Sequence, residues 1–247
     1  MQPMTSYIVL IEVNKFFDDK QVLHDVSLDI PKGSIYGLLG PSGCGKTTTV
    51  KIMSGILSAS SGTAWVLEEK MPNLSTMQKI GYLAQSDALY GSLNGVENLE
   101  FFGQIYGLTG KPLKDAILEV LDFVNLKDDL TKPVASYSGG MKRRLSLAIA
   151  LLHKPEILIL DEPTVGIDPL LRQTIWEEFY VMAKKGITLL VTTHVMDEAE
   201  KCSHLSMMRN GRILASGSPS KIIAESGSNT LEEAFLSYSR AGDDHEG

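Results

Sequence analysis

Short runs of apolar residues, closed by glycine or by polar side chains, recur along the chain. Ile35–Leu39, Ile157–Leu160 and Thr188–Thr193 are dominated by apolar residues, which predicts buried strands, with Ile157–Leu160 at the centre of a parallel sheet. From Ile8 to Ile30 the apolar positions alternate with polar ones around Asp18-Asp19. That alternation predicts two or three strands joined by a turn.

The periodicity changes to that of helices between residues 92 and 152. Apolar residues three or four positions apart, the spacing of one helix face, occur at Val96, Leu99, Phe102 and Tyr106 and again at Ile117, Leu118, Leu121 and Val124. We therefore expect a helical insertion in an α/β domain. Later patterns predict helices at Leu170–Ala183, Met196–Cys202 and Leu231–Tyr238, and a hairpin that turns at Asn210-Gly211.

The stretch after the strand Ile35–Leu39 matches G-x-x-x-x-G-K-[ST] completely and leads into a helical run from Thr47 to about Leu57. Glycines let backbone N–H groups curl around an anion, and the helix adds its N-terminal dipole. We expect Lys46 to reach the terminal phosphates, and Thr47 or its neighbour Thr48 to offer a hydroxyl to Mg²⁺. The alternative, a glycine-rich turn with a solvated lysine, is disfavoured. The predicted phosphate ligands are Gly40, Pro41, Ser42, Gly43, Cys44, Gly45, Lys46, Thr47 and Thr48.

Polar side chains end three further predicted strands. Asp161 and Glu162 directly follow Ile157–Leu160. Since Mg²⁺ prefers carboxylate oxygens, Asp161 is a candidate magnesium ligand, and Glu162 is placed to orient or deprotonate an attacking water. Gln85 and His194 end two other strands. A lone glutamine is usually a surface residue and a lone histidine is more often structural, so both are candidates only because neighbouring strand ends already indicate phosphate chemistry.

Two more segments have open alternatives. Ser138-Gly139-Gly140 begins a helical run, where Ser138 can cap the helix or donate to a phosphate oxygen. Taken alone, a capped helix in a bundle is the better explanation. Phe17 ends a strand before the phosphate loop, so its ring either belongs to the core or stacks on an adenine.

Composition narrows the classes of function. The 247 residues carry a formal net charge of −7, which disfavours a nucleic-acid partner. Two cysteines, Cys44 and Cys202, predict neither a disulfide framework nor a cysteine metal cluster. Cys44 precedes a predicted helix, so its thiol is either easily ionised and alkylated or an inert small residue. No run of 18 apolar residues occurs, so we do not expect the chain to cross a bilayer by itself.

Taken together and in this order, the motifs resemble the ATP-binding-cassette (ABC) ATPase family over the chain up to about Tyr238. The resemblance implies an α/β fold with a P-loop NTPase core and a mixed sheet, an N-terminal antiparallel β subdomain and an inserted α-helical subdomain. The family signature most often begins with Leu and ends in Gln, whereas this chain has Tyr137 and Met141. Only the Ser-Gly-Gly between them carries over directly.

The resemblance also assigns roles to single residues. Phe17 corresponds to the aromatic that stacks on adenine, and Asp168 to the aspartate loop. Gln85 corresponds to the glutamine that senses Mg²⁺ and the membrane partner, and His194 to the switch histidine. The implied catalytic set is Lys46, Gln85, Glu162 and His194, the magnesium ligands are Thr47, Gln85 and Asp161, and Ser138, Gly139, Gly140 and Asp168 join Phe17 and the phosphate loop in binding ATP.

We expect one ABC ATPase domain over residues 1–240. Residues 1–90 and 154–218 would form the nucleotide-binding α/β core, and residues 91–153 the helical subdomain that carries the signature. Residues 219–240 would form a C-terminal helical extension, and residues 241–247 a disordered tail.

The implied function is hydrolysis of ATP with Mg²⁺ to drive export through separate transmembrane permease subunits, at the cytoplasmic inner face of the cell membrane. One phosphate loop and one signature imply a head-to-tail homodimer with ATP sandwiched between the subunits. The signature segment and Val165–Pro169 resemble the branch that exports drugs, lipids or polysaccharides in bacteria.

Two alternatives stay open. A soluble ABC ATPase of translation, DNA repair or iron–sulfur assembly shares the motifs but usually carries tandem cassettes, coiled-coil insertions or basic surfaces. A phosphate-loop kinase or switch GTPase explains neither the Ser-Gly-Gly segment nor His194.

Overall fold

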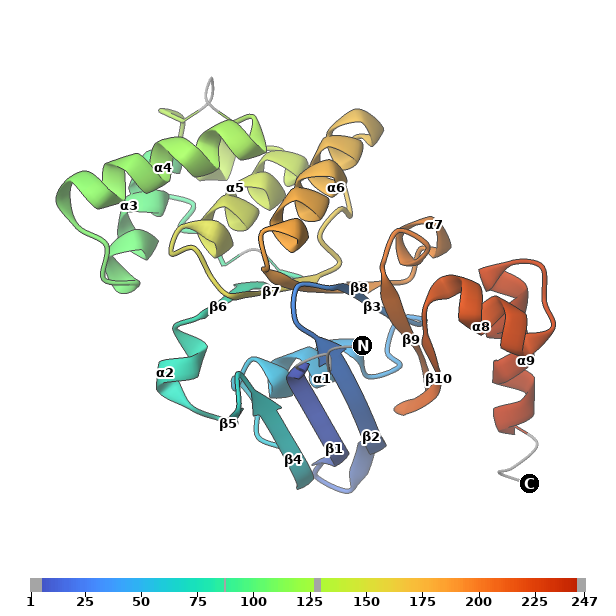
Figure 1. Cartoon of the computed structure of the whole chain (residues 1–247). Helices are drawn as coiled ribbons and strands as arrows, with labels where there is room; N and C mark the ends of the chain where they lie inside the picture. Colours follow the sequence, from blue (N-terminus) through green and yellow to red (C-terminus); the bar gives the residue numbers. More distant parts are fainter. Residues whose placement is uncertain (1–5, 87, 127–129, 244–247) are drawn as a thin grey trace.

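The computed structural model describes residues 6–86, 88–126 and 130–243, which form two sheets and a set of helices, most of them packed around the larger sheet (Figure 1). The larger sheet has six strands in the order β10-β9-β3-β8-β7-β6. These strands are β3 (Ile35–Leu39), β6 (Ile80–Leu83), β7 (Ile157–Asp161), β8 (Thr188–Thr193), β9 (His204–Arg209) and β10 (Arg212–Gly217). β10 pairs antiparallel with β9 and the other pairs are parallel, so the predicted mixed sheet is confirmed.

Strand β7 shows why the central strands are apolar throughout. Its five residues are all buried. Leu158 and Leu160 belong to the cluster on one face of the sheet, while Ile157 and Ile159 belong to the cluster on the other. Because side chains alternate between the two faces of a strand, a strand covered on both sides needs apolar residues at every position.

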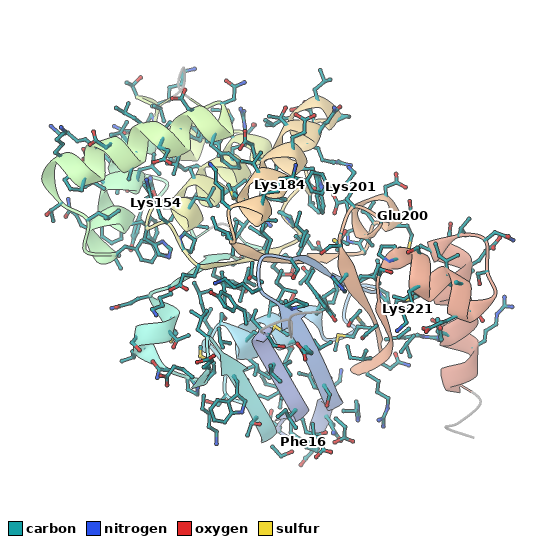
Figure 2. The ribbon with its side chains drawn as sticks, viewed as in Figure 1. Phe16, Lys154, Lys184, Glu200, Lys201 and Lys221 are labelled. Atoms are coloured by element: carbon teal, nitrogen blue, oxygen red, sulfur yellow. The ribbon has the colours of Figure 1, made fainter. Side chains whose placement is uncertain are left out.

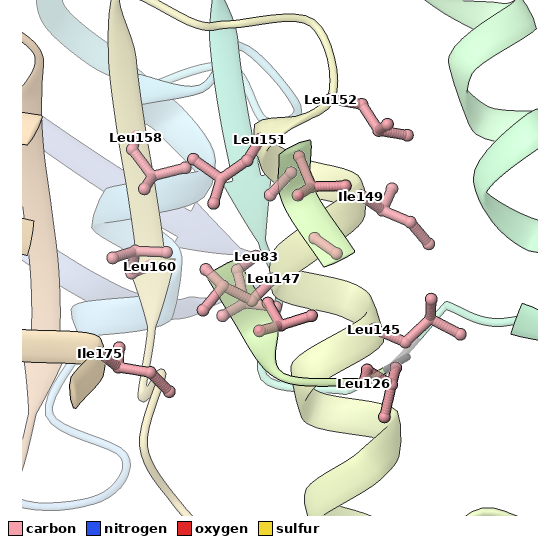
Figure 3. Close-up of a cluster of buried hydrophobic side chains, with 14 of the residues drawn as sticks. Leu83, Leu126, Leu145, Leu147, Ile149, Leu151, Leu152, Leu158, Leu160 and Ile175 are labelled. Atoms are coloured by element: carbon pink, nitrogen blue, oxygen red, sulfur yellow. The ribbon is translucent and has the colours of Figure 1, made fainter. Parts of the chain in front are cut away.

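Four long helices cover one face of this sheet, above it in Figure 1. They are α3 (Gly95–Ile105), α4 (Gly110–Val124), α5 (Gly139–Leu151) and α6 (Pro169–Lys184), with a 3₁₀ turn at Val134–Ser136 before α5. Figure 3 shows Leu147 and Leu151 of α5 in the same buried cluster as Leu83, Leu158 and Leu160 of the sheet. The predicted helical insertion is present, although residues 127–129 lie outside the described residues.

The opposite face of the sheet packs against α1 (Lys46–Met53) and an antiparallel sheet in the order β2-β1-β4-β5. The antiparallel sheet comprises β1 (Ser6–Phe17), β2 (Lys20–Pro31), β4 (Ser61–Val66) and β5 (Glu69–Lys70). The remaining helices are α2 (Leu74–Met77), α7 (Met196–Ala199), α8 (Pro219–Ser226) and α9 (Leu231–Asp243). The predicted antiparallel β subdomain and the hairpin around Asn210-Gly211 are thereby confirmed.

Three predicted helix ends were wrong, those of α1, α7 and α9. Helix α1 stops at Met53 and not near Leu57, because Gly55 adopts a left-handed φ of 79° just after it. Helix α7 stops at Ala199, after which the N–H of Cys202 bonds the Ala199 carbonyl in a tighter turn.

At the C-terminus, helix α9 continues to Asp243, whereas we expected disorder from residue 241. Buried Leu231 and Ala234 of α9 pack with Ile222 of α8, which anchors the helix on the fold. Residues 1–5 and 244–247 lie outside the described residues, and the subdomain boundaries remain a proposal. No helix in the described part of the chain is long and apolar enough to cross a membrane.

The packing of α5 on the sheet can be tested with Leu147→Ala. Leu147 is 1% exposed within the cluster of Figure 3, so we expect a loss of about 2–5 kcal/mol in the free energy of unfolding, measured by urea denaturation. Leu118→Ala is the matched control on α4, where the side chain is 60% exposed, and should change stability by less than about 0.5 kcal/mol. Equal losses in the two variants would contradict the packing.

Candidate active site

The segment between β3 and α1 borders a cleft of about 140 Å³. Gly45 has a φ of 111°, and a Cβ on Gly40 would lie 2.2 Å from the carbonyl oxygen of Met208. Glycine is therefore required at both positions. The cleft is lined by Val22, Ser42, Gly43, Gly45, Lys46, Thr47, Thr48, Gln85 and Glu162. The structure thus brings the predicted phosphate loop together with two of the predicted strand-end residues.

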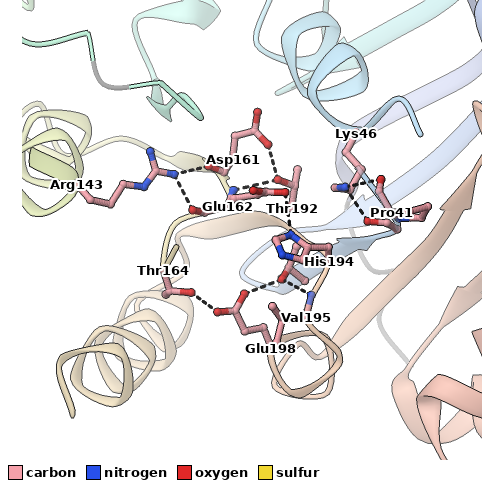
Figure 4. A network of polar contacts seen from close by, with 12 residues as sticks. Pro41, Lys46, Arg143, Asp161, Glu162, Thr164, Thr192, His194, Val195 and Glu198 are labelled. Carbon is pink, nitrogen blue, oxygen red and sulfur yellow. Dashed lines mark hydrogen bonds and ion pairs between the residues drawn. The ribbon is translucent and has the colours of Figure 1, made fainter. Parts of the chain in front are cut away.

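Lys46 lies across this loop. Its side chain is buried, and Nζ donates to the carbonyl oxygens of Gly40, at 2.7 Å, and Pro41, at 3.0 Å (Figure 4). A cation is therefore held at the wall of a cleft lined largely by backbone and hydroxyl groups. That arrangement suits an anionic ligand such as a phosphate chain.

Asp161, the last residue of β7, is fully buried. Its Oδ1 accepts a hydrogen bond from the hydroxyl of Thr192 on β8, whereas Oδ2 has no hydrogen-bond partner among the described residues. A buried carboxylate oxygen without a partner is costly unless a cation or water satisfies it. Carboxylate oxygens are ligands that Mg²⁺ prefers, so the unpartnered oxygen of Asp161 fits a magnesium ion. Thr47 lines the cleft, whereas Asp161 is not among its lining residues.

Glu162 follows with a φ of 54°, a left-handed backbone that a non-glycine residue adopts at a cost of about 1–3 kcal/mol. The backbone N–H of Glu162 bonds both the carbonyl oxygen and the hydroxyl of Thr192. Its Oε1 lies 3.1 Å from Nδ1 of His194. The carboxylate of Glu162 is mostly buried and lines the cleft, while His194 is about half exposed and is not among the lining residues.

Behind the site, Glu198 of α7 connects two loops (Figure 4). Its carboxylate is buried and accepts hydrogen bonds from the hydroxyls of Thr164 and Thr193. The Thr193 hydroxyl in turn accepts the N–H of Val195. This carboxylate therefore ties the segment after Glu162 to the segment that carries His194.

The Ser-Gly-Gly segment lies in a different place. Ser138 caps α5 by accepting the N–H of Met141 at 3.2 Å, and Asp168 caps α6 by accepting the N–H of Leu171 at 3.0 Å. Both line a second cleft, of about 420 Å³, whose lining comprises Ser138, Gly139, Gly140, Arg144, Gly166, Ile167, Asp168 and Leu171. The capping role considered for Ser138 is observed, and the chain does not bring the segment into the phosphate-loop cleft.

Phe17 is not a core residue, because it is 45% exposed at the end of β1. Figure 2 shows the neighbouring Phe16 at the outer end of the antiparallel sheet. Lys15 Nζ lies 5.1 Å from the centre of the Phe17 ring. The exposed ring and the proximity of Val22 of β2 to the cleft are compatible with base stacking, which stays a prediction.

The hypothesis that Cys44 ionises easily is wrong. Its thiol is buried, and this burial raises the pKa of Cys44 above the usual value, outweighing the opposing charge of Lys46. Desolvation disfavours the thiolate, so we expect Cys44 to behave as the inert small residue of the alternative.

Sequence reasoning missed the polar residues that support the site. Thr192 could have been found from its place near the end of the predicted strand Thr188–Thr193, and the structure pairs it with Asp161. Glu198 resembles an ordinary acid in the first turn of a helix, and Arg143 resembles part of a solvated basic run. No sequence pattern distinguishes these two from surface residues.

The phosphate loop, the acids Asp161 and Glu162 at a strand end and the mixed sheet together define a P-loop nucleotide-binding protein. A family model described as "ABC transporter" matches residues 23–165. The chain is 37% identical, over 93% of its length and 77% of the relative's, to the Nod factor export ATP-binding protein I of Cupriavidus metallidurans strain CH34. This chain therefore belongs to the ABC transporter family, as predicted.

A second relative is longer. The chain is 40% identical over 95% of its length to the probable multidrug ABC transporter ATP-binding protein YbhF of Escherichia coli K12, but it spans only 42% of that protein. Among solved structures, an ATP-binding subunit of an ABC transporter matches with a TM-score of 0.87 and 26% identity over 95% of this chain and all of that one. The predicted fold class is thus confirmed.

The buried thiol of Cys202, which contacts the carbonyl oxygen of Glu198, gives a test of pH dependence. Burial raises the pKa of Cys202 to about 12. As the pH rises past about 8.5, the unfolded chain loses this proton while the folded chain keeps it, so folding becomes less favourable. Relative to Cys202→Ala, we expect the free energy of unfolding of the wild type to fall by about 2 kcal/mol between pH 8 and pH 10, measured by urea denaturation. Parallel pH profiles for the two proteins would contradict this assignment.

Proposed function

We propose that this chain is the ATP-binding and ATP-hydrolysing subunit of an ABC exporter. The observation that carries the proposal is the cleft that joins the phosphate loop, Lys46, Gln85 and Glu162, where Glu162 directly follows the buried Asp161. A phosphate binder without hydrolysis needs the loop but not the strand-end acids. Their convergence therefore favours hydrolysis of the bound nucleotide.

Different residues would bind the nucleotide and its magnesium ion. The backbone N–H groups of the loop and Lys46 would hold the phosphates, and Phe17 would stack on the base. Asp161, Thr47 and Gln85 would hold Mg²⁺, which when bound neutralises charge on the phosphate oxygens. The unpartnered Oδ2 of Asp161 supports this role.

Glu162 is the proposed general base. Its carboxylate lines the cleft, and His194 Nδ1 contacts Oε1 and so restricts the rotamer of the side chain. The N–H of Glu162, bonded to Thr192, fixes the backbone from which the carboxylate projects. A carboxylate held in this way can orient a water and accept its proton.

A head-to-tail homodimer follows from the two separate clefts. The phosphate loop lies in one and Ser138, Gly139 and Gly140 lie in the other, together with Asp168. If each subunit supplies its second cleft to the nucleotide of its partner, one chain accounts for two equivalent sites with two-fold symmetry.

The membrane partner is proposed to dock beside the Gln85 segment. Tyr90, Phe101 and Ile105 are exposed there, and the rings of Tyr90 and Phe101 are 4.7 Å apart. Buried Asn98 of α3 accepts the N–H of Tyr90 and donates to its carbonyl oxygen, so this segment and the helix form one surface. Exposed clustered aromatics mark interaction sites. A transmembrane permease subunit bound here would place the chain on the inner face of the membrane.

The direction of transport rests on the relatives. Their names describe a multidrug transporter and a Nod factor exporter, which favours export over import and over a soluble ABC ATPase. The cargo itself would be recognised by the membrane subunits.

The catalytic assignment predicts the behaviour of Glu162→Gln. Without a base, Mg-ATP turnover should fall by about 10²-fold or more, measured by phosphate release. Binding of ATP should persist, so ultracentrifugation with Mg-ATP should show a dimer. Lys46→Ala is the control that should lose binding and dimer together. Intact turnover in Glu162→Gln would refute the base, and a purely monomeric variant would remove the support for the sandwich.

The docking surface predicts the behaviour of Phe101→Ser combined with Ile105→Ser. Expressed with its native neighbouring genes, the wild type should sediment with membranes and co-purify with a hydrophobic polypeptide. The double variant should lose both while its own ATPase rate stays within about twofold. Leu118→Ser, at an exposed site on α4, is the matched control and should keep both. Retained sedimentation of the double variant, or ribosome association of the wild type, would overturn this surface.

A further inference from the structure

Arg143 lies in the first turns of α5, the helix that Ser138 caps. Its side chain points back toward the sheet and ends beside Asp161 and Glu162 (Figure 4). Only 5% of the residue is exposed. An arginine buried at this depth is expensive unless its donors are satisfied.

Four main-chain carbonyl oxygens accept hydrogen bonds from the Arg143 guanidinium. Nη1 donates to Ala84, Nη2 to Asp161 and Glu162, the latter at 2.8 Å, and Nε to Pro163 at 3.3 Å. Ala84 immediately follows β6, and the other three acceptors are at and beyond the end of β7. The planar fork of one side chain therefore spans the ends of two neighbouring strands.

These carbonyls belong to the backbone that presents the site. Gln85 follows Ala84 directly, and Glu162 is itself one of the acceptors. Beyond Leu83 and Leu160 the two strands have no further ladder pair, so the guanidinium supplies the next connection between them. The left-handed backbone of Glu162 also persists only if its surroundings hold it in place.

We propose that Arg143 is a positioning residue for ATP hydrolysis, which fixes the backbones of Gln85 and Glu162 relative to each other and to the helix of the Ser-Gly-Gly segment. It acts through main-chain carbonyls and does not contact nucleotide. Helix α5, which begins at the cleft of the Ser-Gly-Gly segment, thus positions Glu162, the proposed general base in the phosphate-loop cleft. This inference rests on the proposed function.

The test compares Arg143→Ala, Arg143→Lys and the wild type in Mg-ATP hydrolysis and in equilibrium ATP binding. Loss of the fork should lower kcat about 10- to 100-fold, because small displacements of a catalytic group have large effects, while the Kd for ATP stays within about twofold because the phosphate loop is untouched. A lysine has one ammonium and cannot reach four acceptors, so the kcat of Arg143→Lys should lie between those of Arg143→Ala and the wild type. If Arg143→Ala does not fold, Arg143→Lys alone carries the comparison.

Chemical rescue separates positioning from general destabilisation. Guanidinium chloride, well below the molar concentrations that unfold proteins, should raise the kcat of Arg143→Ala several-fold and leave Arg143→Lys and the wild type unchanged. Lys142→Ala removes the neighbouring cation of α5, and Ile149→Val loosens the buried face of the same helix. Both controls should keep kcat within about twofold.

Three results would overturn the inference: wild-type kcat in folded Arg143→Ala, a loss shared by Ile149→Val, or a loss that guanidinium does not restore. Glu162→Gln distinguishes this failure from failure of the proposed function. If Glu162→Gln is inactive while the Arg143 variants are unaffected, only the positioning role is refuted. If Glu162→Gln is fully active, the proposed base is refuted, whatever the Arg143 variants do.

Discussion

Because β3, β8, β7 and β6 pair in parallel, their carboxyl ends meet at one edge of the sheet. The phosphate loop follows β3, His194 follows β8, Asp161 closes β7 and Gln85 follows β6. The phosphate loop and His194, roughly 150 positions apart along the chain, thus reach the same edge of the sheet. The apolar clusters on both faces of the sheet hold this arrangement, and the chemistry at the edge depends on them.

Polar contacts take over where the apolar core ends. Thr192 bonds both Asp161 and Glu162, Glu198 joins the loops after β7 and β8, and Arg143 joins the ends of β6 and β7. Each contact is buried or partly buried, where hydrogen bonds are directional and costly to break. Asp161 and Glu162 are therefore held by surrounding polar groups to which we assign no role in binding a ligand.

The sequence predicted the parts of the molecule that depend on local patterns. The buried strands, the phosphate loop and the acids after Leu160 follow from periodicity and spacing, and the family resemblance implied the mixed sheet with its antiparallel β subdomain. Helix ends such as Met53 and Ala199 depend on single backbone angles and turns that periodicity does not record. The contacts of Arg143 and Glu198 depend on hydrogen-bond partners that are distant in sequence and come close only in the folded chain. The separation of Ser138 from the loop cleft agrees with the head-to-tail homodimer that the resemblance implied.

The left-handed backbone at Glu162 sets a conflict between folding and chemistry at this one position. A glycine would adopt the same φ without a penalty from Cβ and would relieve the local cost. The side chain that the conformation disfavours is the one that lines the cleft. If Glu162 is the base that we propose, glutamate at this position is an instance of the stability–activity trade-off, in which a residue serves activity although another would suit the fold better.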